Sequence, residues 1–376
     1  MMSIIIFIII LAVLVLSHEF GHFIVAKKSG IRVDEFGLGF PPRAYSIKKG
    51  ETVYSLNWIP FGGFVKIFGE DPDDTSVSGP DSSRSIVNKN RWIQAAVLVA
   101  GVTFNIILAW LLLSVGYMSG LPSSTELAPK GVTVEQSRLL ITSVLVGSPA
   151  EKAGIKATDQ VLYLDDGKVR IDQPELKVIQ DFFAGHGGKE IKVGVSRSAN
   201  PFGSIPGDKL ELKVTPIEGI VAGKAGVGVS LDKIGIVSLP VHLALWEGAK
   251  LTYNLTRETI LAFGHLIKGI FGPGKSALGS VIGPIGLVGL VGDARGLGLA
   301  YLLSFTAFIS INLAVINLVP FPALDGGRLL FLALEGIRRK RFNPKVINMV
   351  NAIGFFILIG LMLAVTYGDI VRLFIK

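Results

Sequence analysis

The chain contains no cysteine, and only 18% of its 376 residues are charged, where a typical soluble domain has about 25%. The absence of cysteine excludes disulfides, iron–sulfur clusters, thiolate zinc sites and a cysteine nucleophile. The scarcity of charge excludes an ordinary water-soluble globule, because half of the residues are hydrophobic and the mean hydropathy is +0.56. The composition therefore predicts a membrane protein.

Four apolar segments are long enough to cross a bilayer at about 1.5 Å per helical residue. We expect them at 1–29, 92–118, 297–337 and 350–376, the third interrupted by two prolines and two glycines. A signal peptide is the alternative for the first segment. It is disfavoured because no basic residue precedes the apolar run and no small-residue cleavage site follows it. The predicted fold class is a multi-pass α-helical membrane protein with about four transmembrane helices.

The basic surplus lies at the ends of these spans. The net charge is +8, whereas residues 121–240 hold 14 basic and 14 acidic residues and are neutral. Lys27-Lys28, Lys89, Arg91 and the basic loop 338–349 all fall on one side, which the positive-inside rule makes cytoplasmic. The charge therefore indicates contact with a lipid bilayer, not with nucleic acid.

Between the spans we expect folded parts. Residues 30–91 predict a membrane-associated β-hairpin or small sheet on the cytoplasmic side, followed by a mobile loop over 71–85. In this sheet, 52–57 and 62–69 are expected as adjacent strands. Residues 236–296 predict an amphipathic helix and a linker.

Residues 121–235 predict an inserted α+β domain outside the cytoplasm. Its strand-like pieces recur at 140–145, 161–164, 190–195 and 209–214. A short helix is expected to begin near Pro149 and to stop at Gly154.

The strongest chemical signal is His18-Glu19-Phe20-Gly21-His22 in the first span. Histidines four residues apart lie on one helical face and can share a zinc ion, and a glutamate beside the first can act as general base on a water. Ionisable side chains within a span are costly and indicate function. The alternative is that the three side chains merely reach toward the nearby interface.

A catalytic zinc site needs a third protein ligand and one position left for water. Asp325 is the candidate, because it lies near the cytoplasmic end of the third span, level with His22, beside the residues that interrupt the helix. A helix-capping role is the alternative. His186, His242 and His265 fall on the other side of the bilayer and are expected to lie outside the site.

Together these motifs resemble the site-2 protease family of intramembrane zinc metalloproteases, most nearly the bacterial regulator of sigma-E protease type. The likeness rests on HEFGH, on the N-x-x-P-x-P-x-x-D-G-G pattern at 317–327 and on a single insert between the second and third spans. It covers nearly the whole chain. It includes residues 147–164, which are similar to the core of a PDZ domain, and Gly283-Pro284-Ile285-Gly286, which is similar to a family S-G-P-V-G stretch.

The resemblance implies one Zn²⁺ per chain, bound by His18, His22 and Asp325, with Glu19 as the general base. It also implies that Asn317 helps to bind the carbonyl of the substrate.

In the second span, Asn105 fits the family's polar position, and we expect it to contribute to substrate binding. The stretch 101–105 departs from the family's A-G-P-x-x-N pattern, because it lacks the usual proline.

The segment Gly62, Gly63, Phe64 and Val65 is expected to bind substrate. A helical substrate must unwind before its peptide bond is accessible, and this segment could pair with the unwound chain as an added strand. A hairpin that only shields the zinc is the alternative.

The expected function is zinc-dependent intramembrane cleavage of a single-span membrane protein, such as an anti-sigma factor, a signal-peptide remnant or a pheromone precursor. The expected location is the bacterial cytoplasmic membrane, with an upstream site-1 protease as a further partner. The PDZ-like domain either binds a newly exposed carboxyl terminus or excludes substrates with bulky outer domains. A catalytically silent adaptor and a metal transporter are the alternative function classes.

Overall fold

The computed structural model describes residues 2–70, 74–126, 128–129, 132–145, 147–198, 200–202, 207–221, 224–271, 283–296 and 298–374. The chain divides into two compact units. The membrane unit comprises Met1–Ser114, Gly248–Gly292 and Leu303–Lys376, and the β-rich unit comprises Val115–Glu247 and Asp293–Leu302. Each unit is described by itself below.

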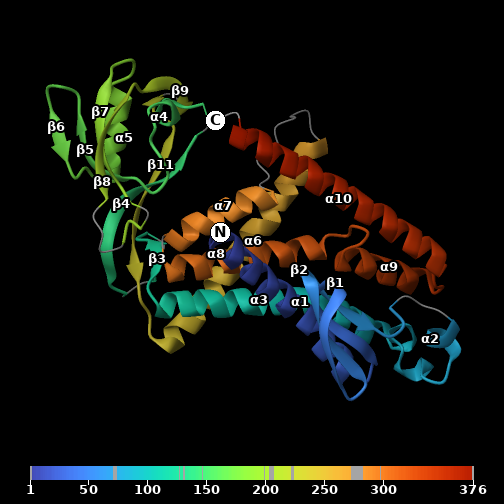
Figure 1. The fold of residues 1–376 in the computed structure, drawn as a ribbon. Helices are drawn as coiled ribbons and strands as arrows, with labels where there is room; N and C mark the ends of the chain where they lie inside the picture. Colours follow the sequence, from blue (N-terminus) through green and yellow to red (C-terminus); the bar gives the residue numbers. More distant parts are fainter. Residues whose placement is uncertain are drawn as a thin grey trace. The chain divides into compact units, whose positions relative to one another are not determined.

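Four helices in the described residues are long and apolar enough to cross a membrane, which agrees with the number expected from the sequence. They are α1 (Met2–Lys28), α3 (Arg91–Met118), α8 (Leu299–Leu318) and α10 (Pro344–Phe374) (Figure 1). α1 ends in a Schellman turn: Gly30 has a φ of +67°, and the Ile31 N–H donates to the Ala26 carbonyl at 3.0 Å. This sharp end turns the chain directly into the neighbouring sheet.

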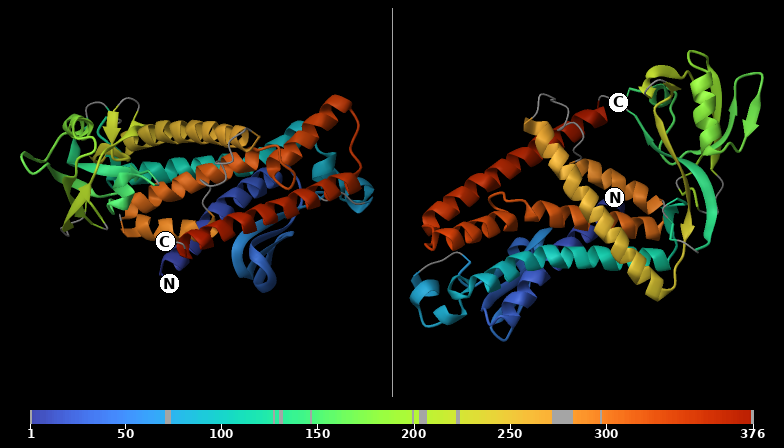
Figure 2. Two further views of the ribbon diagram at one scale, coloured as in Figure 1. Left: turned by 90° about the horizontal axis from the view of Figure 1, so that it is seen from above. Right: turned by 180° about the vertical axis from the view of Figure 1, so that it is seen from behind.

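The interruption in the third apolar segment is a turn between two helices. α8 stops at Leu318 before Pro320, and α9 (Asp325–Arg338) follows after a short turn (Figure 2). The second helix begins at Asp325, earlier than the apolar pattern alone suggests. Gly326 is required there, because a Cβ on it would lie 2.3 Å from the Val319 carbonyl oxygen.

The membrane unit also contains a small sheet made of two long, irregular strands, β1 (Val33–Lys49) and β2 (Thr52–Ile67). Phe36 pairs with Tyr54 on one side and with Val65 on the other. The expectation that 52–57 and 62–69 are adjacent strands is therefore wrong: the first half of β1 lies between them. The segment 63–67 is an edge, since no other strand of the described residues pairs with its far side.

Two further expectations need correction. The part of the predicted loop 71–85 that the structure describes contains two short helices, α2 (Asp74–Ser78) and η1 (Ser82–Arg84), while 71–73 lie outside the described residues. A third short helix, η2 (Ile86–Asn88), follows the loop. The expected amphipathic helix is α6 (Val241–Phe271), but the following linker contains a second helix, α7 (Pro284–Gly296). The Asp369 carboxylate holds the start of α7 by accepting from the Gly283 and Gly286 N–H groups at 3.2 and 2.9 Å.

The core of the membrane unit joins α3 and α8. Ala109 and Leu113 of α3 pack against Ala307 and Ile311 of α8, and all four are at most 1% exposed. Between these helices the Ser310 hydroxyl donates to the Asn105 carbonyl at 2.8 Å. These contacts hold α3 and α8 beside each other and fix the position of the segment that follows α8.

The β-rich unit is built on a seven-stranded antiparallel sheet in the order β3-β11-β4-β5-β7-β8, with β6 paired to β5. The strands are β3 (Leu121–Ser124), β4 (Val134–Val144), β5 (Gln160–Asp165), β6 (Arg170–Asp172), β7 (Ile191–Arg197), β8 (Asp208–Val214) and β11 (Val229–Val237). A second pair consists of β9 (Ile217–Val221) and β10 (Lys224–Gly226).

Two helices complete the β-rich unit, α4 (Pro149–Lys152) and α5 (Leu176–Gly185). α4 begins after Ser148, whose hydroxyl accepts from the Glu151 N–H, and it is followed by Gly154 at a φ of +79°. Ile179 of α5 packs on the sheet, where Leu164 and Val195 are fully buried. The expected strands and the Pro149 helix start are all present in this unit.

Candidate metal centre

α1 presents two imidazoles on one face. His18 and His22 are one helical turn apart, each is 8% exposed, and their Nε2 atoms are 3.1 Å from each other. Ionisable residues are rare in membrane-spanning helices, and those that occur face the protein interior, where they pair with other groups. Their ring nitrogens therefore need partners that the helix itself does not supply.

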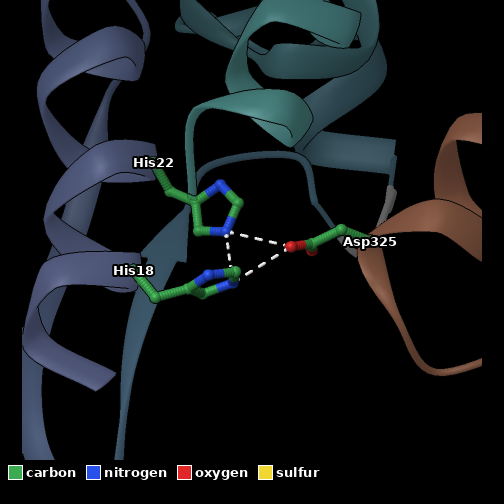
Figure 3. Close-up of side chains that lie close together, drawn as sticks. All are labelled: His18, His22 and Asp325. Atoms are coloured by element: carbon green, nitrogen blue, oxygen red, sulfur yellow. Dashed lines mark hydrogen bonds and ion pairs between the residues drawn. The ribbon is translucent and has the colours of Figure 1, made fainter. Parts of the chain in front are cut away.

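Asp325 is the third member of the cluster, and it comes from the first residue of α9. Its Oδ2 lies 3.0 Å from His18 Nε2 and 3.3 Å from His22 Nε2. Figure 3 shows the three side chains pointing toward a common point. The structure thus brings together the three ligands that the sequence suggested, although 303 positions separate His22 from Asp325 (325 minus 22).

The donor set fits a divalent cation. The Val97 carbonyl lies 2.8 Å from His22 Nδ1 and can only accept, so Nδ1 carries the proton and Nε2 offers a lone pair. Asp325 Oδ2 is buried and has no hydrogen-bond donor apart from the imidazoles. A single proton cannot satisfy three converging atoms, whereas a central cation can. Their separations match the edge of about 3.3 Å of a tetrahedron with zinc bonds of about 2.0–2.1 Å.

α3 forms the back of this site, a feature that the sequence did not reveal. A Cβ on Gly101 would lie 2.5 Å from His22 Nε2, and a Cβ on Gly21 would lie 2.4 Å from the Ala100 carbonyl oxygen. These two glycines let α1 and α3 approach closely enough for the Val97 carbonyl to reach His22. The only sequence signal was the presence of glycine within two apolar helices.

Asn105 lies behind His18, on the side away from the cluster of ligand atoms. It is fully buried, and its Nδ2 is 3.4 Å from His18 Nδ1, while its Oδ1 has no partner. Exchanging the amide oxygen and nitrogen would let Oδ1 accept the His18 Nδ1 proton. Asn105 does not line either of the cavities beside the centre.

Glu19 lies between the ligands and the edge strand. Glu19 lines both cavities that adjoin the ligands, together with Val65 in the larger one and Gly63 in the smaller one. Gly63 is close by: a Cβ on it would lie 3.6 Å from Glu19 Cγ and 3.1 Å from Val15. The carboxylate that sequence analysis selected as the base therefore adjoins the predicted substrate strand.

Two cavities adjoin the centre, and both are lined by His18, Glu19 and Asp325. The larger, of about 970 Å³, also contacts Phe64 and Val65. The smaller is of about 300 Å³. It is lined in addition by Val15, Gly62, Gly63, Leu313, Asn317, Ala323 and Leu324. Of the four strand residues expected to bind substrate, Gly62 and Gly63 therefore line the smaller cavity, and Phe64 and Val65 line the larger one.

The wall of the larger cavity carries an ion pair that the sequence did not predict. Arg328, one turn along α9 from Asp325, pairs with Glu70, which follows the end of β2 by three residues. Lys89, Arg91 and Arg341 lie around the same cavity. This end of the cavity is therefore polar and basic.

The other histidines lie away from the centre, as expected. His242 and His265 are exposed on α6. His186 belongs to the β-rich unit, where its Nε2 is 3.0 Å from Asp166 Oδ2 and its Nδ1 is 2.7 Å from the Phe182 carbonyl. Hydrogen bonds from the Val169 and Lys168 N–H groups, together with His186, lower the pKa of Asp166 to about 2.

Comparison with known proteins places the chain among proteases. The model of peptidase family M50 matches residues 6–361. A protein of Clostridium perfringens described as a candidate zinc metalloprotease is 35% identical over 95% of both chains. The zinc metalloprotease RasP of Geobacillus kaustophilus and the regulator of sigma-W protease RasP of Bacillus subtilis are 29% and 28% identical over 99% of each chain.

Proposed function

The chain belongs to peptidase family M50, the site-2 protease family, and from this premise we propose that it cleaves single-span membrane proteins within or near their membrane segment. It is a multi-pass membrane metalloendopeptidase that uses zinc. The proposed ligands are His18, His22 and Asp325. The observation that supports them is the convergence of two imidazole nitrogens and one carboxylate oxygen within 3.0–3.3 Å of each other.

Bound zinc supplies Lewis-acid chemistry, which acidifies water and polarises a carbonyl. Glu19 is proposed to take the proton from the attacking water on its carboxylate and to deliver it to the nitrogen of the leaving amine. Its place beside His18 and Asp325, in both cavities that adjoin the ligands, supports this role. The peptide bond breaks, and the products are a new carboxylate and a new amine.

Asn317 is proposed to donate its amide N–H to the oxygen of the scissile carbonyl as negative charge develops there. The residue lies at the end of α8 and lines the smaller cavity together with Glu19. A neutral donor at this position stabilises the oxyanion without adding another ionised group to a site that already contains Asp325 and Glu19.

The edge strand at 62–65 is proposed to bind the unwound substrate by strand addition. Its edge, which pairs with no other strand of the described residues, and the closeness of Gly63 to Glu19 support this proposal. Gly62 has a φ of +97°, and Gly63 has no side chain to separate the two backbones. Proline scanning through 62–68 is the test: proline removes one N–H at each position, and cleavage that stayed intact throughout would contradict strand addition.

Asn105 is proposed to orient His18 and not to contact substrate. Its burial behind the imidazole, 3.4 Å from Nδ1, supports this assignment. A hydrogen bond to the second nitrogen of a metal-bound histidine selects the tautomer and fixes the ring.

Residues 121–235, the strands and short helices of the β-rich unit, are proposed to form a PDZ-like domain outside the cytoplasm. It either recognises a carboxyl terminus or acts as a size filter, and we favour the filter. Deleting this segment separates the two, because a filter predicts that full-length substrates then become cleavable. Full-length substrates that stayed uncut after the deletion would count against the filter.

The proposed substrates are membrane-anchored regulators or signal-peptide remnants in the bacterial cytoplasmic membrane, with a site-1 protease acting upstream. One relative is named as a regulator of sigma-W protease, which supports the regulator type. The basic ends of α1, α3 and α9 support an active site near the cytoplasmic face.

The test is cleavage of a model single-span substrate by the wild type and by Glu19→Gln, together with zinc analysis. We expect Glu19→Gln to retain zinc and to lose cleavage, because the amide cannot take a proton. Glu258→Gln on α6, at an exposed position, is the matched control and should cut normally. Equal cleavage by wild type and Glu19→Gln would contradict Glu19 as the base, and zinc without any cleavage by the wild type would favour an adaptor or transporter.

A further inference from the structure

Asp325 reaches the two imidazoles by way of a tight turn between α8 and α9. The turn comprises residues 321–324, and the Leu324 N–H donates to the Phe321 carbonyl at 3.2 Å. Pro322 at the second position and a positive φ of +73° at the third, Ala323, are features of a type II β-turn. The backbone of this turn therefore sets the direction in which Asp325, the residue after it, leaves the turn.

Alanine is an unusual residue at the third position of this turn. A positive φ there favours glycine, because the Cβ of another residue is crowded by the following carbonyl oxygen. Ala323 is exposed and lines both cavities beside the centre, so the packing of its own methyl group does little to hold this conformation. A strained backbone persists only where its surroundings fix it. Contacts from other parts of the fold must therefore supply the restraint.

Helix α10 supplies two of these contacts. Asn351 of α10 is half-buried, and its side-chain Oδ1 accepts a hydrogen bond from the Ala323 N–H at 3.2 Å. Gly354, three residues further along α10, lets the helix come close to the turn, since a Cβ on it would lie 2.6 Å from Pro322 Cβ. α10 thus holds both central residues of the turn, although 28 positions separate Ala323 from Asn351.

The turn also packs against the start of α9. The Gly327 N–H donates to the Leu324 carbonyl at 3.0 Å, and a Cβ on Gly327 would collide with the Phe321 carbonyl oxygen. Asp325 lies between these contacts, and its Oδ2 is 3.0 and 3.3 Å from the Nε2 atoms of the two imidazoles. A change in the backbone torsions of the turn would therefore move the carboxylate relative to both rings.

We propose that Asn351 is a positioning residue for the metal centre. Its Oδ1 holds the Ala323 N–H and so keeps the turn in its strained conformation, which directs the Asp325 carboxylate toward the two imidazoles. Without this acceptor, the turn relaxes toward a negative φ at Ala323, and the carboxylate moves away from the rings. The inference rests on the proposed function, since it assumes the three proposed ligands. Because those ligands stay in place when Asn351 is changed, the loss of metal affinity is partial.

The test measures the zinc affinity of the full-length protein by competition with a chelator. It also records the visible spectrum after Co²⁺ replaces Zn²⁺, because the visible bands of Co²⁺ depend on the arrangement of its ligands. Asn351→Ala should bind zinc about tenfold more weakly than the wild type and should change the cobalt spectrum. Asn351→Asp keeps an oxygen acceptor and should restore both readouts. Asn348→Ala is the matched control and should change neither, since Asn348 is exposed about one turn earlier on α10 and lines the same larger cavity.

The substitution Ala323→Gly distinguishes positioning from a general role in packing. Glycine adopts a positive φ without strain, so a turn that carries Ala323→Gly no longer depends on the Asn351 acceptor. In that background, Asn351→Ala should lower zinc affinity by about twofold at most, which makes the two substitutions non-additive. If Asn351 served only to pack α10, the loss would be the same with and without Ala323→Gly.

The inference is overturned if Asn351→Ala binds zinc as tightly as the wild type, or if neither Asn351→Asp nor Ala323→Gly restores the affinity. Asp325→Ala distinguishes this failure from that of the proposed ligands, because it should not retain zinc through purification. Loss of zinc in Asp325→Ala with normal affinity in Asn351→Ala overturns only the positioning role. Full zinc affinity in Asp325→Ala would instead overturn the proposed ligand set.

Discussion

Each unit of the protein buries charged side chains, but the two clusters differ in whether they are complete. In the β-rich unit, Asp159 is fully buried and Arg197 donates to both of its oxygens, at 2.8 and 2.7 Å. The Lys156 N–H adds a third hydrogen bond at 2.9 Å. Both carboxylate oxygens of Asp159 therefore accept hydrogen bonds from the chain itself, so this cluster needs no further partner.

The cluster of His18, His22 and Asp325 in the membrane unit is incomplete. Its three ligand atoms lie within 3.3 Å of each other. Each can offer a lone pair, but there are too few protons to join all three by hydrogen bonds. A buried polar group without a hydrogen-bond partner costs free energy, so a buried cluster with unpaired atoms indicates a missing partner. The difference teaches that burial of charge does not by itself identify a functional site; the count of donors and acceptors does.

The largest expected effect comes from breaking the incomplete cluster. His18→Ala removes one ligand, and we expect purified protein to lose its zinc and all detectable cleavage. Metal analysis and the substrate assay measure this. His265→Ala, at an exposed position on α6, is the control and should retain both. Stoichiometric zinc in His18→Ala would show that the ligand set is wrong.

Breaking the complete cluster should instead destabilise the fold and spare the chemistry. Arg197→Ala leaves Asp159 buried without its cation, which we expect to lower the free energy of unfolding of the β-rich unit by about 3 kcal/mol. Hydrogen exchange of full-length protein in detergent measures this locally, and zinc content should not change. Arg170→Ala removes an exposed pair that solvent screens, and it should leave the stability of the unit nearly unchanged. Equal losses in the two variants would contradict the distinction between buried and exposed pairs.

Removing the hydrogen-bond partner of a metal ligand should have an intermediate effect on zinc binding. Asn105→Ala removes the partner of His18 Nδ1, and we expect zinc affinity to fall about 10- to 100-fold while the protein remains folded. Competition with a chelator measures the affinity. Asn312→Ala is the control, because that half-buried amide of α8 donates to the Phe308 carbonyl of its own helix at 2.8 Å and lines neither cavity. A substrate-binding role for Asn105 would instead change KM at unaltered zinc affinity.

The smallest effect concerns Asp166 and His186 in the β-rich unit. The folded-state pKa of Asp166 is lowered to about 2, so its ionised form adds stability above the ordinary value of 3.8 and loses that contribution as the pH falls toward 2. Asp166→Asn should therefore lower the melting temperature by a few degrees at pH 6. Melting curves should show the difference disappearing between pH 4 and 2; a difference that grew in this window would refute the assignment.

Much of the fold was predictable because it follows from local pattern. Length and hydropathy predicted the four spans, and the proline and glycine positions predicted the break before Asp325. In the β-rich unit, alternation predicted four strands, and Pro149 with Gly154 predicted a helix and its end. These features depend on neighbours in the sequence.

Strand order and the second helix after α6 were not predictable in this way. Segments 52–57 and 62–67 each carry a strand pattern, but only the fold inserts the first half of β1 between them. Glycine and proline around 283–286 suggested a linker, whereas the Asp369 carboxylate caps the first N–H groups of α7 from the far end of the chain.

By itself the sequence determined the chemistry that is possible: without cysteine, a metal in this protein depends on histidine and carboxylate, and the four-residue spacing put two imidazoles on one helical face. The tertiary structure alone decided that Asp325 meets them, that the Val97 carbonyl faces His22, and that Gly101 leaves room for both rings. The physical reason is the range of the interactions. Helix formation depends on residues a few positions apart, whereas a metal site depends on atoms a few ångströms apart, and only packing brings distant parts of the chain to that distance.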